Sequence, residues 1–190
     1  MKAWVEGYAD KPHAELALFV LAFTESSFFP IPPDVLLIAM CVMVPARAFR
    51  YALICSVGSV LGGVFGYFIG YAFFEAAGQP ILEMYGAMGH YENVRQLYDE
   101  HAFWAILAAG FTPIPYKVFT IAAGAFEISL WTLVAASVIG RSARFFLVAG
   151  LFYFFGAPIK KFIDKYFELL TIAFLVLLVG GFLVIRLFIR

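Results

Sequence analysis

The sequence predicts an all-α integral membrane protein built on an inverted repeat. Each repeat is a re-entrant helical hairpin followed by a transmembrane helix. An interfacial connector helix joins the repeats, and a C-terminal transmembrane helix follows the second one. The composition predicts the membrane class: 64% of the 190 residues are hydrophobic and 14% are charged, against roughly 45–50% and about 25% in soluble domains. The mean hydropathy of +0.92 agrees.

Uncharged segments predict three full crossings of the membrane. Tyr51–Phe74 is 24 residues without a charge, and 17 apolar residues run from Leu169 to Ile185. About 20 residues are enough to cross a hydrocarbon core of ~30 Å. Ile128–Ile159 is also long enough, although it carries Arg141 and Arg144 in its middle.

Two other apolar segments, Glu15–Met43 and Ala102–Phe126, are interrupted by prolines and predict the re-entrant hairpins. The pieces on either side of each break are about 10–16 residues long, too short to cross alone. Broken helices at membrane depth occur where the backbone is buried in protein or lines a cavity. The breaks come at Pro30, Pro32, Pro33, Pro113 and Pro115.

A self-match between the two proline clusters predicts the repeat. Residues 28–39 align with residues 111–122 at a spacing of 83, and seven of the twelve positions are identical. Because a hairpin returns to its own side and the following span crosses once, the second repeat enters from the opposite face. In transporters of this architecture the binding site lies near the midplane, where the broken segments meet.

We expect a single membrane domain. Repeat one covers about residues 14–76, the polar connector 77–101, repeat two 102–157 and the C-terminal helix 160–190. No cleavable signal peptide is evident. Seven Lys or Arg residues fall on the N-terminal side and three on the other, which predicts a multi-pass protein of the cytoplasmic membrane with its N-terminus inside.

The remaining polar residues argue against an enzyme, a metal site and a nucleic-acid partner. Lys and Arg total 13, as do Asp and Glu. Cys41 and Cys55 lie in apolar runs and are expected to be buried hydrophobes. His13, His90 and His101 are scattered through polar segments. No common catalytic motif is present, and we expect no cofactor.

Asp34 and Lys117 occupy equivalent positions of the two repeats and carry opposite charges. A charge at bilayer depth costs about 2.5–3.5 kcal/mol on insertion scales, so each is expected to have a use. One interpretation has them face each other or a shared cavity, where Lys117 meets an anionic headgroup and Asp34 is its counter-ion or a proton carrier. The alternative is a purely structural ion pair.

Glu25 lies in an apolar stretch nine residues before Asp34. Because burial away from water favours the neutral form of a carboxylate, Glu25 is a second candidate proton carrier. The alternative places it at the membrane interface, on a short first helix.

Arg141 and Arg144 are spaced to share one face of a helix. A guanidinium fork matches the oxygens of a phosphate, so both are candidates for headgroup binding. Free N–H groups at the starts of the broken helices would favour an anion as well. The alternative is that the arginine side chains reach out to the interface.

Gly58, Gly62, Gly66 and Gly70 form a stripe at every fourth position of the first full span. Such a stripe permits close helix contact in lipid. Room for a sliding acyl chain is the other interpretation.

Several of these segments resemble the DedA family, also called the VTT or SNARE-associated Golgi protein family. The resemblance rests on Glu25 with Phe29–Asp34, on the glycine stripe with Tyr67, on Phe111–Lys117 and on Ala123-Gly124. It spans roughly residues 15–157 and implies facing re-entrant hairpins and lipid movement across the bilayer. Bacterial members resemble transporters of undecaprenyl phosphate or phosphatidylethanolamine.

By motif position, Glu25 and Asp34 correspond to the membrane-embedded acidic pair of that family, and Lys117 to the second of two basic positions. The first basic position falls near Phe111 or Thr112, where this chain has no basic residue. That difference weakens the family's phosphate grip unless Arg141 or Arg144 compensates.

We therefore expect a transporter or flippase for a lipid phosphate, undecaprenyl phosphate or a phospholipid, with proton coupling as an option. Its partners would be membrane lipids, and an anionic lipid headgroup would be the substrate. The sequence leaves open whether the protein forms a homo-oligomer. The other hypotheses are a proton- or ion-coupled transporter of a small soluble anion and a membrane scaffold that transports nothing. A lipid path needs an apolar lateral opening, whereas a solute path needs a polar vestibule.

Overall fold

The computed structural model describes residues 12–29, 31–86, 88–112 and 114–156, and these residues form helices and short connections without a strand. The C-terminal helix predicted over 160–190 lies outside the described residues, as do Pro30 and Pro113. The helices are α2 (Pro12–Ser27), α3 (Asp34–Met43), η1 (Pro45–Arg47), α4 (Ala48–Phe73), the π-helix η2 (Phe74–Gly78), α5 (Gln79–Met84), α6 (Met88–Phe111), α7 (Tyr116–Ala125) and a final helix, Leu130–Gly156.

Helix, break, short helix and long helix follow one another twice along the chain. The first set is α2, α3 and α4, and the second is α6, α7 and Leu130–Gly156. The short helices begin at Asp34 and Tyr116, directly after Pro33 and Pro115. Proline has no backbone N–H to donate to a preceding turn, so it favours a new helix start over continuation.

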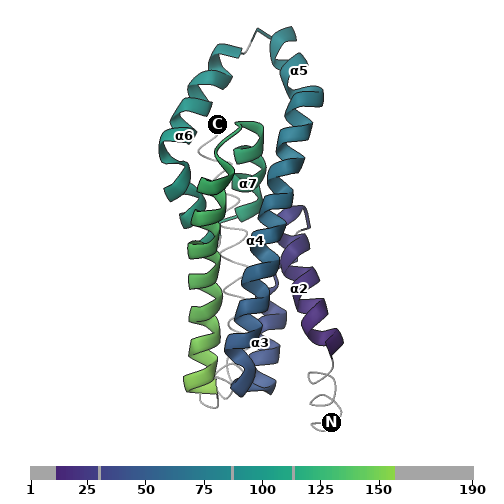
Figure 1. The fold of residues 1–190 in the computed structure, drawn as a ribbon, viewed down its shortest axis with the longest axis vertical. Coiled ribbons are helices and arrows are strands. Elements are labelled where there is room, and N and C mark those ends of the chain that lie inside the picture. Colours follow the sequence, from purple (N-terminus) through teal and green to yellow (C-terminus); the bar gives the residue numbers. More distant parts are fainter. Residues whose placement is uncertain (1–11, 30, 87, 113, 157–190) are drawn as a thin grey trace, which may run out of the picture.

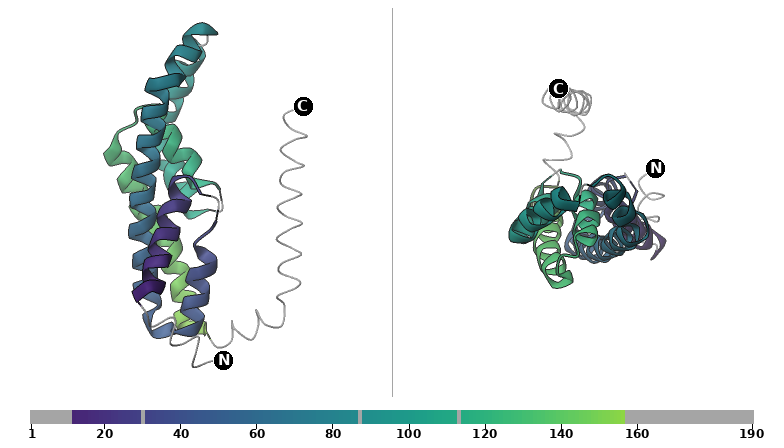
Figure 2. Two further views of the ribbon diagram at one scale, coloured as in Figure 1. Left: turned by 90° about the vertical axis from the view of Figure 1, so that its right-hand side faces the viewer. Right: turned by 90° about the horizontal axis from the view of Figure 1, so that it is seen from above.

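The two hairpins approach each other from opposite ends of the molecule. Figure 1 shows α2 rising from the lower end and α3 returning to it, while α6 descends from the upper end and α7 turns back up. The side view shows both bends near the middle of the long helices (Figure 2). The bend residues, far apart in sequence, are thereby brought to the same level.

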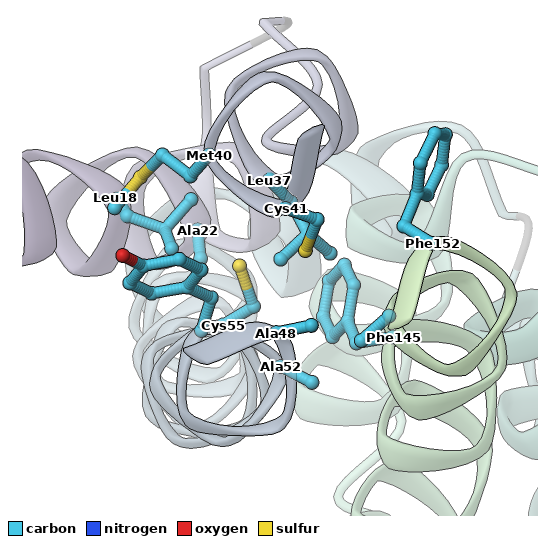
Figure 3. Close-up of a cluster of buried hydrophobic side chains, with 12 residues drawn as sticks. Leu18, Ala22, Leu37, Met40, Cys41, Ala48, Ala52, Cys55, Phe145 and Phe152 are labelled. Carbon is cyan, nitrogen blue, oxygen red and sulfur yellow. The ribbon is translucent and has the colours of Figure 1, made fainter. Parts of the chain in front are cut away.

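Helix α4 is the centre of the packing. It contacts α2 and α7 extensively and α3 to a smaller extent. In the lower half, α4 contributes Cys55 to a buried cluster with Leu18 of α2, Cys41 of α3 and Phe145 of the final helix (Figure 3). Both cysteines are buried and free. A second cluster, around Ile106, fills the space between α6, α7 and the final helix.

Two helical runs are long and apolar enough to cross a membrane. They are Pro45–Met84, with 40 residues, and Leu130–Gly156, with 27. At 1.5 Å per residue the first run is about 60 Å long, roughly twice the thickness of a hydrocarbon core. The all-helical fold and these two runs are those of an all-α membrane protein.

The polar stretch 77–101 differs from the single connector helix that we predicted. It is divided between the end of the Pro45–Met84 run and the start of α6, and the chain reverses between them. The reversal comes at Gly86, whose φ of +63° is one that glycine adopts readily. Tyr91 and Arg95 donate hydrogen bonds to the carbonyls of Ala125 and Phe126, which tie α6 to the end of α7.

All four glycines of the stripe face a neighbouring helix. A Cβ built on Gly58 would lie 2.8 Å from the carbonyl oxygen of Phe19 in α2, and one on Gly66 would lie 2.8 Å from Oγ1 of Thr120 in α7. At Gly62 and Gly70 an added Cβ would overlap the backbone carbonyls of Phe23 and Ile121. The absence of side chains therefore lets α2 and α7 approach the backbone of α4.

Gly70→Ala should destabilise the protein, because its methyl group would meet the backbone of α7, which cannot rotate away as a side chain could. Overpacking of this kind costs about 1–3 kcal/mol. Gly150→Ala is the matched control, since nothing lies within 4 Å of its added Cβ. Thermal unfolding of the purified variants measures the difference, and equal midpoints for the two would contradict the close α4–α7 contact.

Candidate functional site

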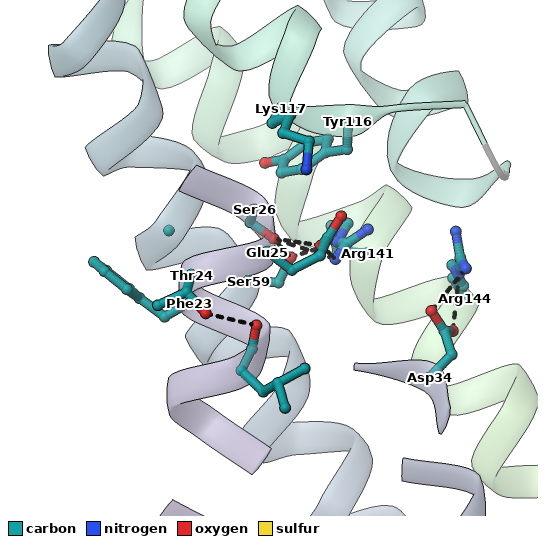
Figure 4. A network of polar contacts seen from close by, with 12 residues as sticks. Phe23, Thr24, Glu25, Ser26, Asp34, Ser59, Tyr116, Lys117, Arg141 and Arg144 are labelled. Carbon is teal, nitrogen blue, oxygen red and sulfur yellow. Dashed lines mark hydrogen bonds and ion pairs between the residues drawn. The ribbon is translucent and has the colours of Figure 1, made fainter. Parts of the chain in front are cut away.

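The two hairpin bends enclose a cavity of about 460 Å³ beside the final helix. Its lining combines four charged side chains with four apolar ones. The lining residues are Glu25, Pro32, Asp34, Val35, Ile114, Pro115, Arg141 and Arg144. The charged residues come from α2, α3 and the final helix, and Figure 4 shows the two arginines turned toward the two carboxylates.

Glu25 and Arg141 form the more deeply buried ion pair. Their side chains are 15% and 3% exposed, and Nη2 of Arg141 lies 2.8 Å from Oε2 of Glu25. The guanidinium also donates to Oγ of Ser59, and to Oγ of Ser26 at 3.2 Å. The two serine hydroxyls are hydrogen-bonded to each other at 2.6 Å. The charge and donors of Arg141 are thus met by α2 and α4 together.

Two aromatic rings complete the surroundings of Arg141. Its Cζ lies 4.9 Å from the ring centroid of Tyr116 and 4.8 Å from that of Phe145, within the range of cation–π attraction. The Tyr116 hydroxyl donates to Oγ of Ser137 at 2.6 Å. A Cβ on Gly63 would overlap that hydroxyl, so this glycine leaves the space that Tyr116 occupies.

Asp34 and Arg144 form the second ion pair in fork geometry. Nη2 and Nε of Arg144 lie 2.8 Å and 3.2 Å from the two carboxylate oxygens of Asp34. The remaining arm of the fork donates to the carbonyl of Thr112 at 2.9 Å, in the bend of the second hairpin. The side chain of Arg144 is 24% exposed and that of Asp34 is 19% exposed, so this pair is more accessible than the first.

Lys117 binds the bend of the first hairpin rather than Asp34. Its Nζ donates to the carbonyl of Phe29 at 2.8 Å, just after α2 has ended. Carbonyls beyond a helix end lack an intrahelical partner and accept side-chain donors readily. Among the described residues Asp34 pairs with Arg144 instead of Lys117, whose ammonium is directed to the Phe29 carbonyl.

Comparison with known proteins identifies the family. The family model of the VTT domain matches residues 31–154. The chain belongs to the VTT-domain family. This confirms the resemblance to the DedA group, whose members are membrane-associated proteins.

Two curated relatives match this VTT-domain protein along most of its length. A protein of Haemophilus influenzae is 33% identical over 169 residues, which cover 89% of this chain and 88% of the relative. A protein of Histophilus somni is 34% identical over 158 residues, covering 83% and 81%. Both are described as uncharacterized. No solved structure matches.

In this VTT-domain protein the arginines point inward. The alternative that they reach the membrane interface does not fit their burial or their carboxylate partners. Glu25 is likewise enclosed by Arg141 and Ser26. Arg141 and Ser59 are 82 residues apart, close to the spacing of 83 between the two proline clusters. Residues at equivalent positions of two repeats meet when they lie on the axis that relates the repeats.

Sequence patterns did not identify Ser26, Thr112 or Tyr116 as members of the site. Serine and tyrosine are common in apolar helices, so their presence does not mark a site. Thr112 takes part through its backbone carbonyl, which every residue has, so its residue type could not indicate the contact. The described residues contain no group of three or more potential metal ligands of the His, Cys, Asp and Glu types. Lys117 is not among the residues that line the cavity. The two arginine forks that do line it have the geometry to bind an anion with several oxygens.

Proposed function

We propose that this VTT-domain protein moves a lipid with an anionic phosphate headgroup, undecaprenyl phosphate or a phospholipid, across the cytoplasmic membrane. The headgroup binds between the hairpin bends while the hydrocarbon tails stay in the bilayer. The task is transport rather than catalysis, with membrane lipids as partners. Its membership of a family of membrane-associated proteins and the charged cavity support this proposal.

The observation that carries the proposal is an apolar rim around a charged cavity. Val35 and Ile114 line the cavity and are also exposed at the surface, Val35 by 69%. Ile31, in the bend of the first hairpin, is exposed as well. A soluble anion would meet a polar mouth, whereas a lipid needs apolar surface for its tails beside charges for its headgroup.

The charges of the site favour an anionic headgroup. The four charges that line the cavity balance one another, and Lys117, bound to the Phe29 carbonyl in the bend of the first hairpin, adds one positive charge outside that lining. Hydrogen bonds between charged groups and phosphate contribute roughly 1.5–3 kcal/mol each. Hydrogen bonds from the Lys117 ammonium and from an arginine fork would therefore offset the free energy that a phosphate loses when it leaves water.

The transport topology follows from the predicted inverted repeat. Pro45–Met84 and Leu130–Gly156 cross the membrane, and α2–α3 and α6–α7 are re-entrant hairpins that enter from opposite faces. The bends then lie near the midplane, which is where transporters of inverted-repeat architecture bind their substrates. The N-terminus is on the cytoplasmic side.

A scaffold without transport is the competing function, because each of the four cavity-lining charges has an ion-pair partner. It predicts that Asp34→Asn combined with Lys117→Met keeps function. Lipid transport predicts that the same double variant is inactive, since it removes one group that binds the headgroup and one that balances it.

Lys117→Ala should slow the transfer of polyprenyl phosphate between the leaflets of proteoliposomes by about tenfold or more, the loss expected for one charge-assisted hydrogen bond. Arg50→Ala removes an exposed cation that pairs with Glu15 away from the bends, and it should leave transfer unchanged. Phospholipid and trapped inorganic phosphate are measured in parallel. Uptake of inorganic phosphate without lipid transfer would favour the soluble-anion transporter, and no transfer of any of them would remove the proposal.

Proton coupling through Glu25 or Asp34 is part of the proposal. Imposing a pH step across the proteoliposome membrane should change the rate of lipid transfer, and Asp34→Asn should abolish the response because an amide cannot take up the proton. If the transfer rate does not change with the pH step in wild type or in the variant, the proton-coupling hypothesis is rejected, while the proposal of lipid transfer stands.

A further inference from the structure

The two cavity arginines lie one helical turn apart on the same helix and each binds one carboxylate at 2.8 Å, but their surroundings differ. Arg141 also lines the cavity, but protein contacts cover most of its side chain. It has Glu25, two serine hydroxyls and two aromatic rings around its guanidinium, and its side chain is 3% exposed. A ligand that took over this guanidinium would have to replace contacts with three helices, α2, α4 and α7.

Arg144 has a simpler set of partners. Its fork holds the two oxygens of Asp34, and one arm binds the carbonyl of Thr112. Its side chain is about a quarter exposed and lines the cavity. The cation–π contacts recorded among the described residues involve Arg141 and not Arg144.

Arg144 binds Asp34 in the geometry with which an arginine fork binds a phosphate group. A guanidinium fork takes two oxygens of a carboxylate or two oxygens of a phosphate in the same plane. Asp34 is the first residue of α3, where the positive end of the helix favours a carboxylate that has lost its partner. Asp34 can therefore be released from Arg144 without leaving its charge unsupported.

We propose that the two arginines have separate tasks: Arg141 is the fixed counter-ion of Glu25, while Arg144 exchanges Asp34 for the headgroup of the lipid. Asp34 is then a competing anion that occupies the site in the empty protein. Arg144 is the specificity-determining residue. This inference rests on the proposed function.

Competition gives the exchange a distinctive signature. Asp34→Asn removes the competing charge but keeps the size of the side chain, so the variant should bind an anionic headgroup more tightly than wild type, by about tenfold. Loss of a merely structural pair would leave affinity unchanged or lower it. Arg144→Gln should weaken binding by roughly ten- to a hundredfold, the range for a lost charged hydrogen bond.

The experiment uses the full chain in mild detergent with short-chain phosphatidic acid as the probe and titration calorimetry as the readout. The variants are Asp34→Asn, Arg144→Gln and Arg141→Gln, with Arg50→Gln as a surface control. Thermal midpoints without lipid are measured on the same samples. Arg141→Gln should lower the midpoint at least twice as far as Arg144→Gln, since more contacts are lost.

Tighter binding by Asp34→Asn together with weaker binding by Arg144→Gln supports the exchange. Binding by wild type that Asp34→Asn weakens or leaves unchanged overturns it, as does an Arg144→Gln variant that binds like wild type. If wild type binds neither phosphatidic acid nor polyprenyl phosphate, the proposed function fails instead. These comparisons hold even if Arg141→Gln cannot be purified, because they need only the Asp34 and Arg144 variants.

Discussion

The ion pair between Glu25 and Arg141 is the interaction on which the arrangement of the hairpins depends. It joins residues 116 apart in the chain. Ser26 is hydrogen-bonded to both of them, and Ser59 of α4 accepts from Arg141 and is hydrogen-bonded to Ser26. Charges buried among apolar helices are tolerated only when they are paired and hydrogen-bonded. Satisfying this guanidinium therefore requires α2, α4 and the final helix to meet at one level, which places both hairpin bends beside one cavity.

Glycine makes that meeting possible. Gly62 and Gly70 let the backbones of α2 and α7 approach α4, and Gly63 leaves space for the Tyr116 hydroxyl. With larger residues, helix separations near the usual 8–10 Å would move the bends apart. The ion pairs and the glycine contacts thus support each other, because the charges hold the bends together and the small residues bring their helices close enough.

The parts of this architecture that depend on backbone chemistry could be predicted from the sequence. Pro33 and Pro115 directly precede the helices that follow each break, as expected from a residue without an N–H group. The self-match between the proline clusters predicted that the two breaks meet, and residues of both breaks, Pro32 and Pro115, line the same cavity. Family membership, which rests on a match over residues 31–154, confirms the resemblance to the family as a whole.

Which charged side chains pair with one another could not be predicted from the sequence in the same way. Equivalent positions suggested that Asp34 and Lys117 meet, but side-chain reach and the geometry of the guanidinium fork favour Arg144, three residues from Arg141. The connector was misjudged because its polar composition says little about where a helix reverses. That point is set by Gly86 rather than by the surrounding charges. Contacts through backbone carbonyls, such as Lys117 with Phe29, have no signature in residue type.

A double-mutant cycle on Glu25 and Arg141 tests the central interaction most directly. The free energy of unfolding is measured in mild detergent for wild type, Glu25→Gln, Arg141→Gln and the double variant. Removing one partner of a buried ion pair typically costs about 3–5 kcal/mol, because the other charge is left uncompensated. If the two residues act as a pair, the double variant is no less stable than the less stable of the two single variants, and the coupling energy is at least ~1 kcal/mol. Additive losses would show that the two residues act independently and would contradict this pairing.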